Sequence, residues 1–195
     1  VDLAARLQMS RTPVREALAR LVIDGFLVPA SRGYMQRTLD VKESLDMYEA
    51  RVAIERECVR LAIERATDAQ LSEALAYLEQ NQRVPADTPM QRLVDLDEGF
   101  HLRLADMADN AELRRMLVSL NERIRFIRWI DMESVRRSST QQEHLEILRA
   151  ISARDSAASE RLMAAHIGLR REQIVDAITR GLARIYLPQE PAATP

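Results

Sequence analysis

The sequence predicts a mostly helical protein in two parts: a small head of short helices with a β-hairpin, and a larger antiparallel bundle of six helices. Of its 195 residues, 47% are hydrophobic and 30% are charged, and only 5 are glycine, which favours a helix-rich chain with a proper core. Apolar residues recur at spacings of three and four over most of the length. Loop signals are few and short, so most helices should be joined by tight turns.

The head is organised around residues 10–21, which read as a helix with two distinct faces. The apolar stripe shares spacings of three and four and consists of Val14, Ala17, Leu18 and Leu21. The second face consists of Arg11, Thr12, Arg15 and Ala19. Ser10 with Pro13 in the first turn is a good helix start. Arg11 and Arg15, one turn apart among small neighbours, suit a helix that enters the major groove of DNA.

The residues on either side predict a helix-turn-helix followed by a hairpin, or wing. Residues 3–7 carry a short helical stripe, and Gln8–Met9 reads as a tight turn. Downstream, Asp24–Gly25 ends the helix with a glycine available for a left-handed cap. Residues 26–37 read as two short strands with a turn at 30–33.

Charge divides the chain at the same point. The net charge is −2, but residues 1–38 hold six arginines against three acidic residues, so the head is +3 and the remainder is −5. A basic head on an acidic body fits a DNA-reading module joined to a part that does not touch DNA.

The run Ser10–Leu18, with residues 3–7, Leu21, Gly25 and Arg32–Gly33, resembles the winged helix-turn-helix of the GntR family of bacterial transcription regulators. The resemblance implies a homodimer on palindromic double-stranded operator DNA. The residues expected to contact this DNA are Ser10, Arg11, Thr12, Arg15, Arg32 and Gly33. Gln8 is a departure, because the family usually has glycine there and a left-handed non-glycine residue costs roughly 1–2 kcal/mol. Val1 falls inside the second helix of this module, so we expect its first helix to be missing.

The body is expected to be the helical bundle. The predicted division is a head at 1–38, a linker at 39–43, the bundle at 44–185 and a Pro-rich disordered tail at 186–195. The six helices are expected at about 42–67, 68–83, 90–108, 111–136, 138–154 and 156–184. Caps are expected at Thr67–Asp68, Ser138–Thr140 and Ser156, and Asp109–Asn110 is expected to turn the chain into the fourth helix.

The three histidines of the chain, His101, His144 and His166, fall on the third, fifth and sixth of these helices. Each lies on or beside a core-facing stripe, and Asp97 precedes His101 by four residues, so both project from one face. Any one of them fits a buried neutral histidine satisfied by a neighbour. Three together, with a carboxylate, fit a divalent metal such as zinc, nickel, iron or manganese inside a bundle. The spacing alone leaves both interpretations open.

Three segments, Asp97–His101, Glu143–Ile151 and Ala165–Ile167, resemble the FCD ligand-binding domain that follows GntR-type heads of the FadR subfamily. The resemblance implies a divalent metal, with zinc preferred over nickel, manganese or iron. It assigns the metal to four ligands, Asp97, His101, His144 and His166. It also implies a small carboxylate or sugar-acid effector on the open side of the ion.

A cation aimed at this effector would be its second anchor. Arg51 is the first candidate, since the family often has arginine at that point and a guanidinium binds a carboxylate bidentately. The alternative, that Arg51 pairs with Glu55 one turn on, stays open. Arg125 is a further candidate, together with Arg128.

The function predicted from these features is a DNA-binding transcription regulator, a repressor by family precedent, and not an enzyme. The alternative is a helical-bundle metalloenzyme acting on a small acid or ester, with Glu143 or Glu98 as base. A third possibility is a metal cluster that only stabilises the fold. The longest apolar run falls short of the ~18 residues of a membrane span, and the single Cys58 excludes an internal disulfide, so a cytoplasmic protein is expected.

Overall fold

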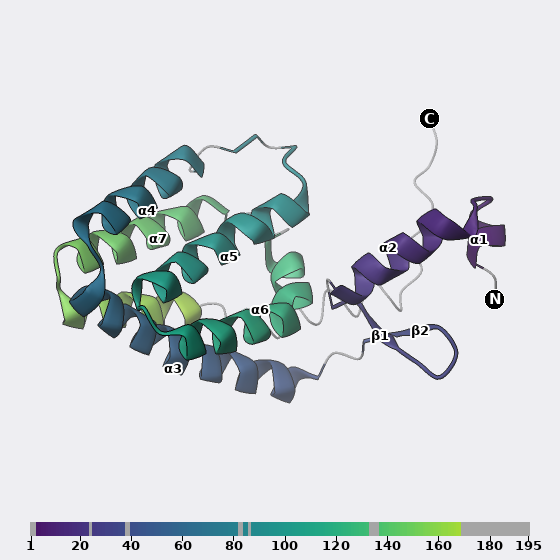
Figure 1. Ribbon diagram of the computed structural model, residues 1–195, viewed down its shortest axis with the longest axis horizontal. Helices are drawn as coiled ribbons and strands as arrows, with labels where there is room; N and C mark the ends of the chain where they lie inside the picture. Colours follow the sequence, from purple (N-terminus) through teal and green to yellow (C-terminus); the bar gives the residue numbers. More distant parts are fainter. Residues whose placement is uncertain are drawn as a thin grey trace.

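The computed structural model describes residues 3–23, 25–37, 40–81, 84–85, 87–132 and 137–168, and it is mostly helical. Its elements in chain order are α1 (Leu3–Arg6), α2 (Arg11–Ile23), β1 (Leu27–Pro29), β2 (Tyr34–Gln36), α3 (Val41–Arg65), α4 (Asp68–Asn81), α5 (Met90–Met107), α6 (Ala111–Met132) and α7 (Arg137–Ser152). Residues 156–168 are also helical. The head, from α1 to β2, lies at one end of the molecule, and the helices from α3 onward gather at the other (Figure 1).

The predicted turn between α1 and α2 is present and left-handed. Gln8 has a φ of 52°, so this position adopts the conformation for which glycine is favoured. The Met9 amide donates to the Ala4 carbonyl at 3.0 Å and closes the turn. Glutamine in place of the family's usual glycine at position 8 therefore does not alter the geometry of the turn.

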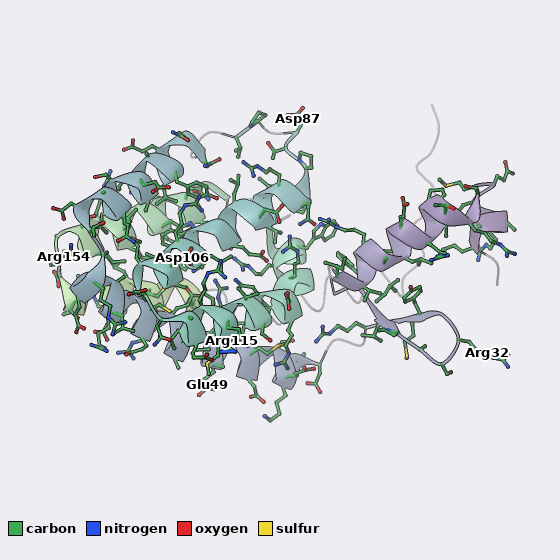
Figure 2. All side chains as sticks on the ribbon, in the orientation of Figure 1. Arg32, Glu49, Asp87, Asp106, Arg115 and Arg154 are labelled. Carbon is green, nitrogen blue, oxygen red and sulfur yellow. The ribbon has the colours of Figure 1, made fainter. Side chains whose placement is uncertain are left out.

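The predicted wing is also present. After α2 the chain turns at Gly25, whose φ of 78° is the left-handed cap expected there. Strands β1 and β2 pair antiparallel, with Val28 opposite Met35, and Gly33 in the connecting turn has a φ of 82°. Figure 2 shows Arg32 at the tip of this hairpin, pointing away from the bundle.

The apolar stripe of α2 is only partly covered. Val14 is buried and Leu18 is half-buried, as the stripe predicts, but Ala17 and Leu21 are exposed. Among the described elements α2 packs mainly against α1 and β1, which are too short to cover the whole stripe.

The bundle is arranged around α5. This helix packs against both α3 and α6, while α4 packs against α7, as the ribbon in Figure 1 also shows. The core is aliphatic with one central phenylalanine, and its fully buried members include Phe100, Leu104, Ile124, Leu148 and Ile167. Within the described ranges, no helix is long and apolar enough to span a bilayer.

Helix starts agree with the sequence in part. Thr67 Oγ1 accepts from the Gln70 amide at 3.3 Å, so the expected cap there is present. At the expected turn into α6, Asn110 Oδ1 also acts as a cap by accepting from two amides of the first turn. The expected cap at Ser156 is wrong, because Asp155 accepts from the Ala158 amide and Ser156 already lies in the helix.

Two other boundaries differ from expectation. Helix α7 begins at Arg137, so Ser138–Thr140 lie inside its first turn instead of preceding it. Helix α3 begins at Val41 because the Asp40 side chain caps it, accepting from the Glu43 amide at 3.0 Å, so residues 41–43 are helix instead of linker. Residue 38 of the expected head, residue 39 of the expected linker, the expected last helix beyond 168 and the tail at 186–195 lie outside the described residues.

The head contacts the bundle through an aromatic pair. The rings of Phe26, next to β1, and Trp129, on α6, meet edge to face with their centroids 5.6 Å apart. Arg37, after β2, lies 3.8 Å from Glu43 of α3, which also accepts from Arg123 of α6 at 2.9 Å. The end of α6 is therefore the part of the bundle that adjoins the head.

Candidate functional site

Four of the residues singled out by the sequence meet inside the bundle. Asp97 and His101 lie one turn apart on α5, His144 lies on α7, and His166 lies in the helical residues 156–168. All four are buried, and one donor atom from each lies within 4.8 Å of the other three. His144 Nε2 lies 3.3 Å from His166 Nε2 and 3.4 Å from Asp97 Oδ1.

His101 is held by a carboxylate from α3. Its Nδ1 contacts Glu55 Oε2, and the other Glu55 oxygen accepts from Arg51 Nε at 2.5 Å. Both Glu55 and Arg51 are buried. Burial by itself raises the pKa of Glu55, but the charges of Arg51 and then His101 outweigh it, so the pKa lies well below its usual range. With Nδ1 engaged, Nε2 is the His101 atom that remains for a ligand.

The other two histidines are also held from behind. His166 Nδ1 lies 2.7 Å from Glu143 Oε2, so its Nε2 likewise faces His144. The His144 ring stacks on Phe100 of α5, with centroids 3.9 Å apart and planes 19° from parallel. Phe100 therefore fixes the plane of one histidine while it fills the centre of the core.

Asp97 is supported from α6. Its Oδ2 contacts the guanidinium of Arg128, which also donates from Nη1 to Asn121 Oδ1 at 3.1 Å. Arg128 and Asn121 are buried with it. Asp97 is therefore held as a carboxylate whose other oxygen, Oδ1, is directed at His144.

This donor set fits a divalent metal ion. Ligand atoms about 2.1 Å from a common ion lie roughly 3–4 Å apart, close to the two separations measured here at His144. Three imidazole nitrogens and one carboxylate oxygen suit zinc, nickel, iron or manganese. Four protein ligands leave one or two positions of a five- or six-coordinate ion for another molecule. An ion there would supply a Lewis-acidic attachment point for an oxygen of that molecule.

The arginines expected near an effector differ in their surroundings. Arg51 pairs with Glu55, as the alternative predicted, yet its buried Nη2 has no hydrogen-bond partner among the residues that the structure describes. Arg125 is held by Glu98 at 2.6 Å and by Asp95. Burial raises the pKa of Glu98 to about 7, which Arg125 only partly offsets. Arg51 thus keeps a buried donor that its ion pair with Glu55 leaves unused.

The expected DNA-contacting residues all lie on the surface of the head. The exposed members are Ser10, Arg11, Thr12, Arg15, Arg32 and Gly33. The first four lie at the start of α2 and the last two in the turn of the wing, so they form two separate surfaces of the head. The head thus presents a helix and a hairpin, the two elements that a winged helix-turn-helix applies to DNA.

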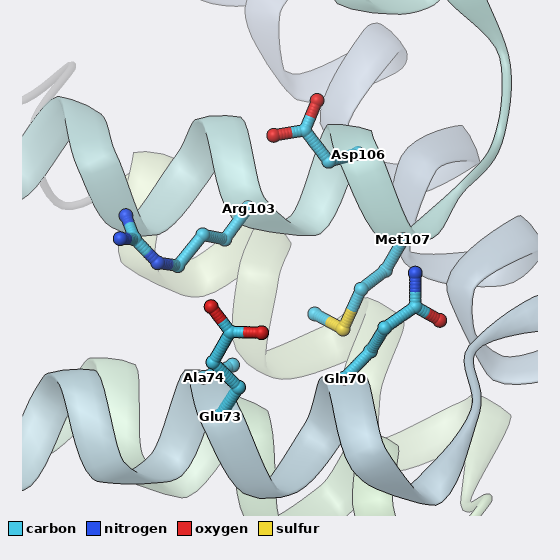
Figure 3. A pocket seen from close by; sticks show the side chains of 6 residues that line it. All are labelled: Gln70, Glu73, Ala74, Arg103, Asp106 and Met107. Carbon is cyan, nitrogen blue, oxygen red and sulfur yellow. The ribbon is translucent and has the colours of Figure 1, made fainter.

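A separate pocket of about 180 Å³ lies between α4 and α5 (Figure 3). Its walls are formed by Gln70, Glu73, Ala74, Arg103, Asp106 and Met107. Arg103 is already engaged, stacked 3.5 Å over the Tyr77 ring and donating to the Gly99 carbonyl at 3.0 Å. No residue of the histidine cluster lines this pocket.

Sequence reasoning missed the residues behind the cluster. It treated Glu55 only as a partner for Arg51 and Glu143 only as an alternative base, and it gave Asn121 and Phe100 no role at the site. Glu143 lies next to His144 in sequence but contacts His166, from another helix. The one available signal was that Glu55 lies four residues after Arg51 on a stripe that proves to be buried.

Comparison with known proteins places the chain in a family. Residues 46–169 match the family described as the FCD domain. The chain is 40% identical over 188 residues to the Nta operon transcriptional regulator of Aminobacter aminovorans, covering 95% of this chain and 88% of that protein. It is 28% identical over 178 residues to the HTH-type transcriptional repressor GlaR of Escherichia coli (strain K12), covering 85% and 80% respectively. These names favour a regulator over the metalloenzyme alternative.

Solved structures agree with this placement. E. coli McbR/YncC shares the fold, with a TM-score of 0.68 at 23% identity, over 93% of this chain and 85% of that one. A GntR family transcriptional regulator from Pseudomonas syringae pv. tomato str. DC3000 superposes with a TM-score of 0.61 at 27% identity, over 91% and 76%. The chain is therefore a transcriptional regulator of the GntR family with an FCD domain, in agreement with the resemblance noted in its sequence.

Proposed function

We propose that this regulator binds a divalent metal and a small carboxylate or sugar-acid effector in its bundle, and that the effector modulates binding of the head to operator DNA. The observation that carries the proposal is the buried convergence of Asp97, His101, His144 and His166 within 4.8 Å. The same chain carries a helix with exposed arginines suited to the major groove. A sensing site and a reading surface in one chain are the two parts that a ligand-controlled regulator needs.

Charge supports an anionic effector. A divalent ion at the cluster, with buried Arg51 and Arg128 against buried Glu55 and Asp97, leaves positive charge in excess, and Glu98, whose pKa is raised to about 7, offsets only part of it. Uncompensated buried charge is unfavourable, so a ligand that brings a carboxylate restores the balance. Arg51 Nη2, a buried donor to which no described residue offers an acceptor, is the group we assign to that carboxylate. Arg125 is a second candidate, but it can bind the ligand only by giving up its ion pair with Glu98.

On the DNA side, we assign base or phosphate contacts to Arg11 and Arg15. Ser10 and Thr12 contact phosphates, and Arg32–Gly33 brings the wing to the minor groove. A homodimer would place two heads on half-sites of a palindrome about 34–36 Å apart. Repression is the expected outcome, because the relative GlaR is named a repressor.

The two halves of the proposal are tested separately. Arg15→Ala should abolish binding to a duplex that the wild-type protein selects from a random pool, while its zinc content stays unchanged. Arg161→Ala, at an exposed arginine in the bundle, is the matched control and should bind the same duplex normally. Full operator affinity in Arg15→Ala would remove the assignment of α2. Purified protein without stoichiometric metal, and unable to take up zinc, would remove the sensing half.

A further inference from the structure

We propose that Glu55 and Glu143 are positioning residues that fix the tautomers of His101 and His166, so that both rings direct Nε2 at the centre of the cluster. The proposal rests on the metal site proposed above and extends it to residues that touch no metal. It concerns which nitrogen of each ring carries the proton. Neutral imidazole has two tautomers, and only the nitrogen without a proton can bind a metal.

The geometry at His101 excludes the wrong tautomer. Glu55 offers Oε2 to His101 Nδ1, and its Oε1 accepts from the guanidinium of Arg51. A carboxylate held by a guanidinium only accepts hydrogen bonds, so the proton of the ring lies on Nδ1. The lone pair is then on Nε2. All three residues are buried, so water does not offer the ring another partner.

A second carboxylate, Glu143 on α7, lies behind the Nδ1 of His166 in the same way. Glu143 Oε2 lies 2.7 Å from His166 Nδ1, and the opposite ring atom, Nε2, lies 3.3 Å from His144 Nε2. The rings of His101 and His166 lie 27° from parallel with centroids 5.3 Å apart, and each has a carboxylate behind its Nδ1. Partners of this kind fix ring orientation and typically change metal affinity 10–100-fold when removed.

The first test uses the metal-free protein, so it does not depend on metal binding. Long-range ¹H–¹⁵N correlation spectra at pH 8 report which nitrogen of each ring is protonated, and three histidines are few enough to assign by single substitutions. We expect His101 and His166 to be protonated on Nδ1 in the wild type. Glu55→Gln should raise the Nε2–H fraction of His101 alone, and Glu143→Ala that of His166 alone.

Matched controls lie on the same helices. Glu57→Gln on α3 removes a charge whose partner is Arg60, and Glu146→Ala on α7 removes an exposed side chain bonded by Gln142. Neither control should change a tautomer. Wild-type rings protonated on Nε2, or tautomers unchanged in both test variants, would overturn the proposal. If Glu55→Gln does not fold by circular dichroism, Glu143→Ala decides, because the Glu143 side chain is 27% exposed and its loss is milder.

The second test measures Zn²⁺ affinity by competition with a chromophoric chelator. We expect a 10–100-fold loss for Glu55→Gln and about 10-fold for Glu143→Ala, with both controls at the wild-type value. Wild-type affinity in both test variants would overturn the positioning role. A wild-type protein that takes up no Zn²⁺ but shows Nδ1–H tautomers contradicts the proposed metal function while supporting the role of the two carboxylates.

Discussion

Gly99 lies between Asp97 and His101 on α5. Replacing it with alanine should affect the free energy of unfolding in two opposite ways. A Cβ at this position would lie 2.5 Å from Tyr77 Oη and 3.2 Å from Arg103 Nη1. Alanine in a helix interior is favoured over glycine by about 1 kcal/mol. Against this, displacing Tyr77 breaks its hydrogen bond to the Leu96 carbonyl, worth about 0.5–1.5 kcal/mol.

Displacing Tyr77 also disturbs its stacking with Arg103, worth about 0.5–1 kcal/mol. Residual overpacking adds to the loss. The losses exceed the gain, so we expect Gly99→Ala to lower the free energy of unfolding by about 1 kcal/mol. Urea unfolding followed by circular dichroism measures this difference.

Tyr77→Phe supplies the control, because it removes the oxygen that the new methyl group meets at 2.5 Å and leaves only the ring carbon Cζ, at 3.2 Å. In the Tyr77→Phe background, Gly99→Ala should raise the free energy of unfolding by up to about 1 kcal/mol, since the propensity gain remains. The double-mutant cycle should therefore give a coupling of about 2 kcal/mol. If Gly99→Ala stabilises both backgrounds equally, the close approach of Tyr77 to α5 does not govern this position.

Three further predictions concern metal, charge and pH. Zn²⁺ at about 100 times its Kd should raise the free energy of unfolding by about 2.7 kcal/mol, or roughly 5–10 °C in Tm, and differential scanning fluorimetry should show no such shift for His144→Ala. An equal shift in that variant would place zinc elsewhere. Arg154 caps the end of α3 by donating to the carbonyls of Ile63 and Ala66, so Arg154→Ala should cost about 2 kcal/mol in urea unfolding, whereas the exposed Arg161→Ala should cost under about 0.5 kcal/mol. Burial, then the nearby Glu55, raises the pKa of the Cys58 thiol from 9.0 to about 12. Because the raised pKa belongs to the folded state, stability is fully present below pH 9 and declines as the pH rises toward 12; Cys58→Ala should lack this decline, and a decline that persists in the variant would assign it to other groups.

Local chemistry accounts for the parts of the fold that the sequence predicted. Gly25 and the Thr67–Gln70 cap are set by neighbouring residues, so their signals are readable along the chain. The cap at Asp155 was misplaced because Asp155 and Ser156 are neighbours and suit the same role. The start of α7 was misplaced because Ser138–Thr140, which are good cap residues, lie within the first turn. The exposure of Ala17 and Leu21 depends on what packs against α2, which periodicity does not report.

The candidate site, like the fold, was predictable from the sequence only where nearby residues determine the structure. Asp97 and His101 share a helix face, so their proximity follows from a spacing of four. The prediction that His144 and His166 belong to the same site rested on the family resemblance, because sequence spacing does not relate residues on different helices. Glu55 reaches His101 only through the packing of α3 on α5, a contact between residues 46 positions apart. Sequence patterns indicate which residues face inward, but not which of them meet.

The contact between Phe26 and Trp129 has a practical consequence. Trp129 is the sole indole of the chain, and it neighbours Arg128, which holds the carboxylate of Asp97. Intrinsic fluorescence therefore originates at the joint between the two halves of the molecule. Separation of Phe26 from Trp129 would expose the indole to water and shift its emission to longer wavelength. The fluorescence of the unlabelled protein therefore reports whether the head and the bundle are in contact.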